Sequence, residues 1–285
     1  MRAKQTLSTL ILAKVFKCEA LQNYPKSHYR TVVHTDADVF WTDEAGKRRI
    51  LFKIRKGVIP HALLDAADAV LRSPSRMHTR NRMVLHNANH SVMDVQHSCL
   101  SGYYDKCDRS EQHLFPTQTV CRPTAFTKNF PDRFAQAVPL FRAIDRVYAR
   151  LAPRHHRMQH AFIDAIPAQL SIDDTVFTTV TTNYNWSTAC HRDSGNFDGG
   201  LGNLTIGGDE RWSGCLLGFP EFRVAVNVRK GDCIIMDAHQ FHCNTPLKLR
   251  EGGGCRLSFV CYARQNMALC TKSKVVNGVK HWYKQ

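Results

Sequence analysis

The feature that most constrains the fold is a change in hydrophobic periodicity near residue 175. Before it, apolar residues recur at helical spacing over 61–72 and 134–151. After it, four segments show the alternating or short apolar pattern of strands: 176–182, 222–228, 233–237 and 255–264. Helices followed by mainly antiparallel strands predict an α+β fold, in which flanking helices pack outside a jelly-roll core, also called a double-stranded β-helix.

The chain shows no repeat or linker, and we predict a single domain over residues 1–285. Its apolar content of 43% is sufficient for one large core. A hairpin pattern over 28–58 precedes the first helix, so we interpret 1–95 as an N-terminal hairpin and helix elaboration. The jelly roll then covers 95–265, and 266–285 form a C-terminal tail.

A Gly-rich stretch over 199–208 is a second local signal. No helical pattern follows it, so it does not have the context of a phosphate-binding loop. We predict that it forms an ordinary loop.

Charge and cysteine content indicate the setting in which the chain works. Lys plus Arg number 39 against 24 Asp plus Glu, and the net charge of +15 favours a polyanionic partner such as nucleic acid, with solubility alone as the alternative. Eleven cysteines without a CxxC pair predict buried free thiols in a reducing compartment. No apolar run reaches the roughly 18 residues of a membrane span. We expect no membrane partner and infer no obligate protein partner.

Metal-ligating residue types cluster in the second half of the chain. His191 and Asp193 follow a predicted strand, and residues two apart on a strand point to the same side. One further ligand from Asp237, His239 or His242 would complete a metal site. With a second histidine, the set becomes the 2-His-1-carboxylate triad that holds Fe(II) and leaves coordination positions open.

The last predicted strand has one unusually polar face. Strand alternation separates Leu257, Phe259, Cys261 and Ala263 from a second set, which comprises Arg256, Ser258, Val260, Tyr262 and Arg264. Burying that second set is unfavourable without a ligand. The polar face is therefore predicted to point inward, where Arg256 and Ser258 would bind the far carboxylate of 2-oxoglutarate, Arg256 through two parallel hydrogen bonds. Exposure of this face on an open sheet is the alternative.

These residues together resemble the TET/JBP dioxygenases, a family of 5-methylcytosine oxidases and thymine hydroxylases. The likeness spans about residues 95–265 and is most similar to the small phage-type and lower-eukaryote members. It rests on the following blocks: Val180-Thr181, His191-Arg192-Asp193 with Asn196, His242 with Thr245-Pro246, and Arg256-Leu257-Ser258 with Tyr262. The resemblance implies a cupin-like jelly roll and selects His242 as the third metal ligand.

The resemblance also implies a role for each site residue. His191, Asp193 and His242 would hold Fe(II), and Arg256 with Ser258 would anchor 2-oxoglutarate. The residues implied to surround the target base are Asn196, Thr181, Tyr262 and Arg264. Arg264 departs from the pattern, because several 5-methylcytosine oxidases carry a base-contacting His there.

The function implied is oxidation of the 5-methyl group of 5-methylcytosine in DNA to 5-hydroxymethylcytosine, or further toward DNA demethylation. The target nucleotide would flip out of the duplex, with 76–82 and Arg211 as candidate phosphate contacts. Thymine is the alternative base, and ascorbate is the alternative co-substrate. A non-catalytic nucleic-acid-binding module is the alternative of another class, although it has no need of a metal triad. A nuclear location follows from the substrate and the thiol content.

Overall fold

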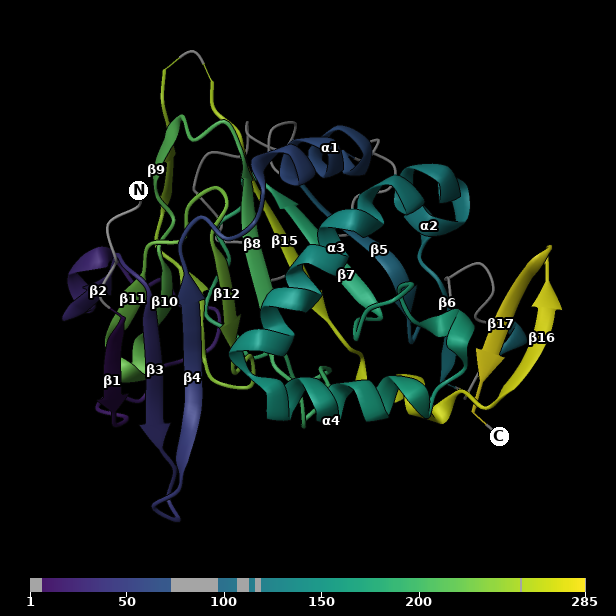
Figure 1. Ribbon diagram of the computed structural model, residues 1–285, viewed down its shortest axis with the longest axis horizontal. Helices are drawn as coiled ribbons and strands as arrows, with labels where there is room; N and C mark the ends of the chain where they lie inside the picture. The colour runs from purple at the N-terminus through teal and green to yellow at the C-terminus, as the bar shows by residue number, and fades with distance from the viewer. Residues whose placement is uncertain (1–6, 73–96, 107–112, 116–118, 252, 285) are drawn as a thin grey trace.

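The computed structural model describes residues 7–72, 97–106, 113–115, 119–251 and 253–284. In this part of the chain the largest feature is an eleven-stranded sheet (Figure 1). From one edge to the other its strands are β1 (Ser8–Leu12), β3 (Ala37–Thr42), β4 (Arg48–Arg55), β12 (Cys233–Met236), β8 (Gly202–Gly208), β15 (Arg256–Tyr262), β7 (Thr179–Tyr184), β5 (His97–Tyr104), β6 (Val120–Pro123), β17 (Val279–Tyr283) and β16 (Lys272–Val276). This sheet confirms the 28–58 hairpin and the predicted strands within 176–182, 233–237 and 255–264. The predicted strand 222–228 is confirmed only over Val224–Val226, which lies in a second sheet.

A second, four-stranded sheet packs on one face of the large sheet. Its strands are β13 (Cys243–Asn244), β10 (Leu217–Phe219), β11 (Val224–Val226) and β2 (Thr31–Val33), and a separate pair is formed by β14 (Leu247–Leu249) and β9 (Trp212–Gly214). Phe52 of β4 stacks on Phe219 of β10 with ring centroids 5.2 Å apart, inside an apolar cluster shared by both sheets. Two sheets joined by such a core form the predicted double-stranded β-helix.

Helices cover the opposite face of the large sheet, as Figure 1 shows. The α-helices are α1 (His61–Leu71), α2 (Ala125–Asn129), α3 (Pro131–Leu151) and α4 (Pro153–Asp164), and short 3-10 turns occur at Lys26–His28, Ala168–Leu170, Pro220–Phe222 and Gln265–Leu269. Their apolar stripes, including Leu64 and Phe141, bury against Phe259 and Cys261 of β15. The predicted helices and the α+β class are confirmed. None of the helices in the described residues is long and apolar enough to cross a membrane.

Strand β15 connects this core to the cavity between the sheets. It lies between β8 and β7, antiparallel to both. Leu257, Phe259 and Cys261 join the core under the helices, whereas Arg256 and Ser258 on the other face are only 2% and 3% exposed. The predicted alternation is confirmed, and the alternative of a solvent-exposed polar face is wrong.

The prediction of a loop over 199–208 is wrong for most of that segment. Gly202–Gly208 is β8, a fully buried strand between β12 and β15. The backbones pack so closely that only glycine fits at Gly208: its φ is +94°, and a Cβ there would lie 2.0 Å from the carbonyl oxygen of Cys255. The glycines therefore mark close approach of backbones rather than chain flexibility.

The residues assigned to a C-terminal tail form the hairpin β16–β17, and β17 pairs with β6. A disulfide between Cys121 and Cys270 lies beside this pairing. The prediction of free thiols is therefore wrong for these two cysteines, while the other eight described cysteines are free and buried. One sheet includes strands from all three predicted parts of the chain, so no sheet boundary coincides with residue 95 or 265. The subdivision at these residues stays a prediction.

Removal of this disulfide should destabilise the protein. The bond closes a separation of 149 residues, and loss of such a cross-link increases the entropy of the unfolded chain. Cys121→Ala combined with Cys270→Ala is expected to lower the free energy of unfolding by about 2–5 kcal/mol, measured from urea denaturation. A reducing agent should bring the wild-type curve to that of the variant. Identical wild-type curves with and without reductant would contradict this expectation.

Candidate active site

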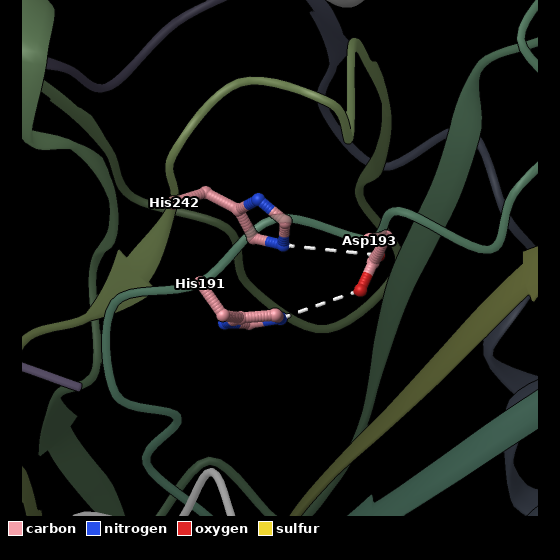
Figure 2. A group of neighbouring side chains, drawn as sticks. All are labelled: His191, Asp193 and His242. Carbon is pink, nitrogen blue, oxygen red and sulfur yellow. Dashed lines mark ion pairs between the residues drawn. The ribbon is translucent and has the colours of Figure 1, made fainter. Parts of the chain in front are cut away.

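Two histidines and one aspartate meet between the sheets. His191 and His242 form an isolated antiparallel bridge, each backbone N–H donating to the other residue's carbonyl at 3.0 Å. The Asp193 backbone N–H donates to the Ala238 carbonyl at 2.9 Å. Nε2 of His191 lies 3.4 Å and Nε2 of His242 3.9 Å from the Asp193 carboxylate (Figure 2). The backbone thus sets the spacing of the three side chains.

The other ring nitrogen of each histidine is held by a backbone carbonyl. Nδ1 of His191 lies 2.8 Å from the Ala189 carbonyl oxygen, and Nδ1 of His242 lies 3.0 Å from that of Gln240. A carbonyl oxygen only accepts, so in each neutral ring Nδ1 carries the hydrogen. Both Nε2 atoms then present a lone pair toward Asp193, which is the arrangement a metal ion requires.

The protonation states in this cluster also suit metal binding. Burial and the neighbouring His191 lower the pKa of His242 to about 4, so its ring is neutral near pH 7. Burial alone would raise the pKa of Asp193, but the hydrogen bond from His191 and the nearby positive charges lower it to about 2. Burial would likewise lower the pKa of His191, but the Asp193 carboxylate raises it, because the protonated ring donates to Asp193 through Nε2. A bound cation would take the place of that proton. The site therefore offers an ionised carboxylate to a cation.

A cavity of about 260 Å³ extends from this cluster between the two sheets. The structure brings all the predicted site residues to its wall: His191, Asp193, His242, Arg256, Ser258, Asn196, Thr181, Tyr262 and Arg264. His191, Asp193 and His242 are the one group in the described residues whose ligand atoms all lie within 4.8 Å of one another. The roles assigned to the individual residues stay predictions.

Arg256 creates a positively charged end of the cavity. Its guanidinium lies 5.4 Å from the Trp212 ring centroid, and that of Arg229 lies 4.1 Å from the same ring. After burial, the charge of Arg256 further lowers the pKa of Arg229. Nε of Arg256 is buried and has no hydrogen-bond partner in the described part of the chain. A carboxylate ligand would supply that partner and the missing negative charge.

A different set of polar groups lines the rest of the cavity. The Thr181 hydroxyl and the Tyr262 phenol lie 3.0 Å apart, and burial raises the pKa of Tyr262, which keeps the phenol neutral. Asn196 is 7% exposed, and its Nδ2 has no partner among the described residues. Arg264 forms a two-pronged ion pair with Asp105 through Nε and Nη2. This end offers hydrogen-bond donors and acceptors to a flat polar ligand.

The rival metal ligands lie outside the cluster. Asp237 accepts hydrogen bonds from the His239 backbone and from the Gln240 amide. The His239 ring lies 3.7 Å from the carboxylate of Asp198. Both interactions are structural, as expected for residues that do not bind the metal.

The phosphate contacts suggested by sequence stay predictions. Arg211 pairs with Asp209 at 2.8 Å and does not line the cavity. Residues 76–82 lie outside the described residues.

Three residues in or next to the cavity wall could not be recognised from the sequence. Trp212 contacts the guanidinium of Arg256, and the Asn183 amide lies 3.4 Å from the Ser258 hydroxyl. Neither residue belongs to a recognisable sequence motif. No spacing in the sequence links Asp105 to Arg264, 159 residues away. Only the folded strands bring these pairs together.

Comparison with known families decides the assignment. A family model named Tet_JBP, described as the oxygenase domain of the 2OGFeDO superfamily, matches residues 99–265. The chain belongs to the Tet_JBP family. The resemblance inferred from the sequence motifs is thereby confirmed. The 2OGFeDO superfamily of which Tet_JBP is part uses Fe(II) and 2-oxoglutarate, so the predicted cofactors are confirmed at the level of the family.

Several Tet_JBP relatives are similar over most of this chain. The bifunctional helicase and thymine dioxygenase JBP2 of Leishmania tarentolae is 34% identical over 82% of this chain and 20% of its own length. The thymine dioxygenase JBP1 of Crithidia fasciculata is 30% identical over 82% of this chain and 27% of its own length. The chain thus spans about a fifth to a quarter of the length of these relatives.

A solved structure shows the same fold. NgTET1 in complex with 5mC DNA matches with a TM-score of 0.57 and 12% identity, over 90% of this chain and 83% of that chain. At this identity the likeness supports the Tet_JBP fold alone.

The residues present fit the cofactors of the Tet_JBP family. Two imidazole nitrogens and an ionised carboxylate form the donor set preferred by Fe(II) with open coordination positions. The buried Arg256 Nε without a partner fits the distal carboxylate of 2-oxoglutarate. One cavity between the sheets therefore contains a metal-binding end at the triad and an anion-binding end at Arg256.

Proposed function

We propose that this protein is an Fe(II)- and 2-oxoglutarate-dependent dioxygenase that oxidises the 5-methyl group of a pyrimidine base in DNA. The observation that carries the proposal is the cavity in which the His191, Asp193 and His242 triad, the buried Arg256 and the polar end around Asn196 share one space. A purely binding module gives no reason for such a metal donor set.

Each end of the cavity has a separate task in this proposal. When bound, iron and 2-oxoglutarate would let dioxygen act as the oxidant: one oxygen atom would enter succinate as 2-oxoglutarate loses carbon dioxide, and the other would enter the hydroxymethyl group of the base. Arg256 and Ser258 hold the distal carboxylate, which fixes the co-substrate in one orientation. Asn196 hydrogen-bonds the edge of the base, and Thr181 with Tyr262 supports the ring beside its methyl group. Because these side chains are buried or partly buried, the base must leave the duplex stack to reach them.

Thymine is the base that we propose first. The relatives at 30% and 34% identity are named as thymine dioxygenases. The 5-methylcytosine oxidation predicted from the sequence is the second candidate, because the Asn196 amide both donates and accepts and so suits either base edge. Ascorbate as the co-substrate is the less supported alternative, since it has no carboxylate for Arg256 to hold.

We propose DNA as the partner and the nucleus as the location. The net charge of +15 supports contact with a phosphate backbone. The location rests only on the proposed substrate.

Mass spectrometry of nucleosides tests the proposal. The protein is incubated with iron and a duplex containing both thymine and 5-methylcytosine, with 2-oxoglutarate or ascorbate in separate reactions. We expect 5-hydroxymethyluracil, formed with 2-oxoglutarate and accompanied by succinate. Absence of any oxidised base in both reactions, from protein that has bound iron, would refute the proposed function.

A further inference from the structure

We propose that Arg264, held in place by Asp105, is the residue that selects thymine over 5-methylcytosine. This inference rests on the proposed function and adds to it the atom that is recognised, the O4 oxygen of thymine. Arg264 is the specificity-determining residue, and Asp105 is a positioning residue that acts through it.

The Arg264 side chain is fixed on one side and free on the other. Nε donates to one Asp105 carboxylate oxygen at 3.0 Å, and Nη2 donates to the other at 3.1 Å. The Asp105 side chain is only 1% exposed, and the guanidinium lies 4.8 Å from the Tyr104 ring centroid. Among the described residues no hydrogen bond is made by the remaining nitrogen, Nη1. The ion pair therefore presents one oriented donor instead of a mobile charge.

The free nitrogen lies at the base-binding end of the cavity. A Cβ built on Gly195 would be 2.3 Å from Nη1 of Arg264, so this nitrogen rests against the loop between Asp193 and Asn196. Asn196 and Arg264 also face each other in an isolated antiparallel bridge, and both line the cavity. Gly195 is thus the residue whose missing side chain lets the guanidinium approach. One base edge can reach the unpaired Asn196 amide and Nη1 together.

The chemistry of the two bases then gives the discrimination. Thymine presents an acceptor oxygen at position 4, whereas 5-methylcytosine presents an amino group there. A guanidinium has donors only and cannot be deprotonated, so it pairs with the oxygen and repels the amine. The acceptor that could have bound an amine, the Asp105 carboxylate, is already occupied by Arg264. Asn196 alone would accept either base, so the preference resides in the pair formed by Arg264 and Asp105.

Modified bases test the assigned atom in the unmutated protein. Iron-loaded enzyme is given matched duplexes containing thymine, 4-thiothymine, 2-thiothymine or 5-methylcytosine, and the 5-hydroxymethyl product is measured by mass spectrometry. Sulfur is a poor acceptor, so we expect oxidation of 4-thiothymine to be about tenfold slower than that of thymine, with a smaller loss for 2-thiothymine. Thymine should exceed 5-methylcytosine by about tenfold or more.

Two variants and one control test the assigned residues. Arg264→Gln can accept as well as donate, and should bring the ratio of thymine to 5-methylcytosine oxidation close to one while abolishing the difference between thymine and 4-thiothymine. Asp105→Asn should lower the same ratio by a smaller factor. Arg72→Gln is the matched control, because Arg72 makes the same two-pronged pair with Asp68 outside the cavity. Its ratio should equal that of the wild type.

The possible failures are distinguishable. The selection of O4 by Arg264 is overturned if the wild type prefers 5-methylcytosine. It is also overturned if Arg264→Gln changes the oxidation rate of 2-thiothymine relative to thymine but not that of 4-thiothymine. In both cases the dioxygenase proposal stands. If the wild type oxidises neither base, the proposed function is refuted and the selectivity with it.

Discussion

Asp193→Ala is expected to abolish iron-dependent turnover while the protein remains folded. The variant loses the one carboxylate of the donor set and keeps two neutral imidazoles, which hold Fe(II) weakly. We expect succinate release to fall by at least about a thousandfold, equivalent to roughly 4 kcal/mol of barrier. The Asp193 side chain is 29% exposed and fills no apolar core, so thermal unfolding of the metal-free protein should change little. Iron stoichiometry and succinate release measure the effect.

A matched control lies on the same loop. Asp198 is also a carboxylate, but its side chain is 86% exposed, and within the described part of the chain its one ion pair is with His239 at 3.7 Å. Asp198→Ala should bind iron and turn over like the wild type. His242→Ala should be as inactive as Asp193→Ala, although His242 is 4% exposed and its loss also removes packing. Full activity and iron content in either ligand variant would disprove the metal assignment.

Arg256→Lys is expected to raise the concentration of 2-oxoglutarate needed for half-maximal turnover by about a hundredfold. Lysine keeps the positive charge but cannot form the two parallel hydrogen bonds that a guanidinium makes to a carboxylate. Arg256 is only 2% exposed, so the hydrogen bonds that lysine cannot make lie inside the protein, where their loss is costly. The measurement is the KM for 2-oxoglutarate in succinate release, with DNA at saturation.

The KM for DNA supplies the internal control, since Arg256 lies at the anion end and away from the proposed base contacts. The KM for DNA should stay within about twofold of the wild type, because a substitution away from the base contacts has little effect on DNA binding. An unchanged KM for 2-oxoglutarate in Arg256→Lys would show that another group anchors the co-substrate, and would favour ascorbate.

Local patterns predicted the parts of the site that lie on single segments. The spacing of His191 and Asp193 and the alternation from Arg256 to Arg264 are properties of a few adjacent residues, and strand geometry converts them directly into position. The choice of His242 needed the family resemblance, because His239 and Asp237 satisfied the residue pattern equally well.

Long-range pairings could not be predicted in the same way. The bond between Cys121 and Cys270 and the ion pair between Asp105 and Arg264 depend on which strands become neighbours. Strand β8 was missed because its glycines are poor strand formers in isolation, and tertiary packing against Leu64 and Phe259 favours them. Sequence periodicity contains no information on such close approach.

The mutual backbone hydrogen bonds of His191 and His242 have a practical consequence. Because main-chain pairing already sets their separation, the ligand side chains are held in place by the fold itself, and metal binding does not have to be coupled to folding. Chelators should then remove the metal ion reversibly without unfolding the protein. Other transition-metal ions can afterwards be bound at the same ligands as spectroscopic probes.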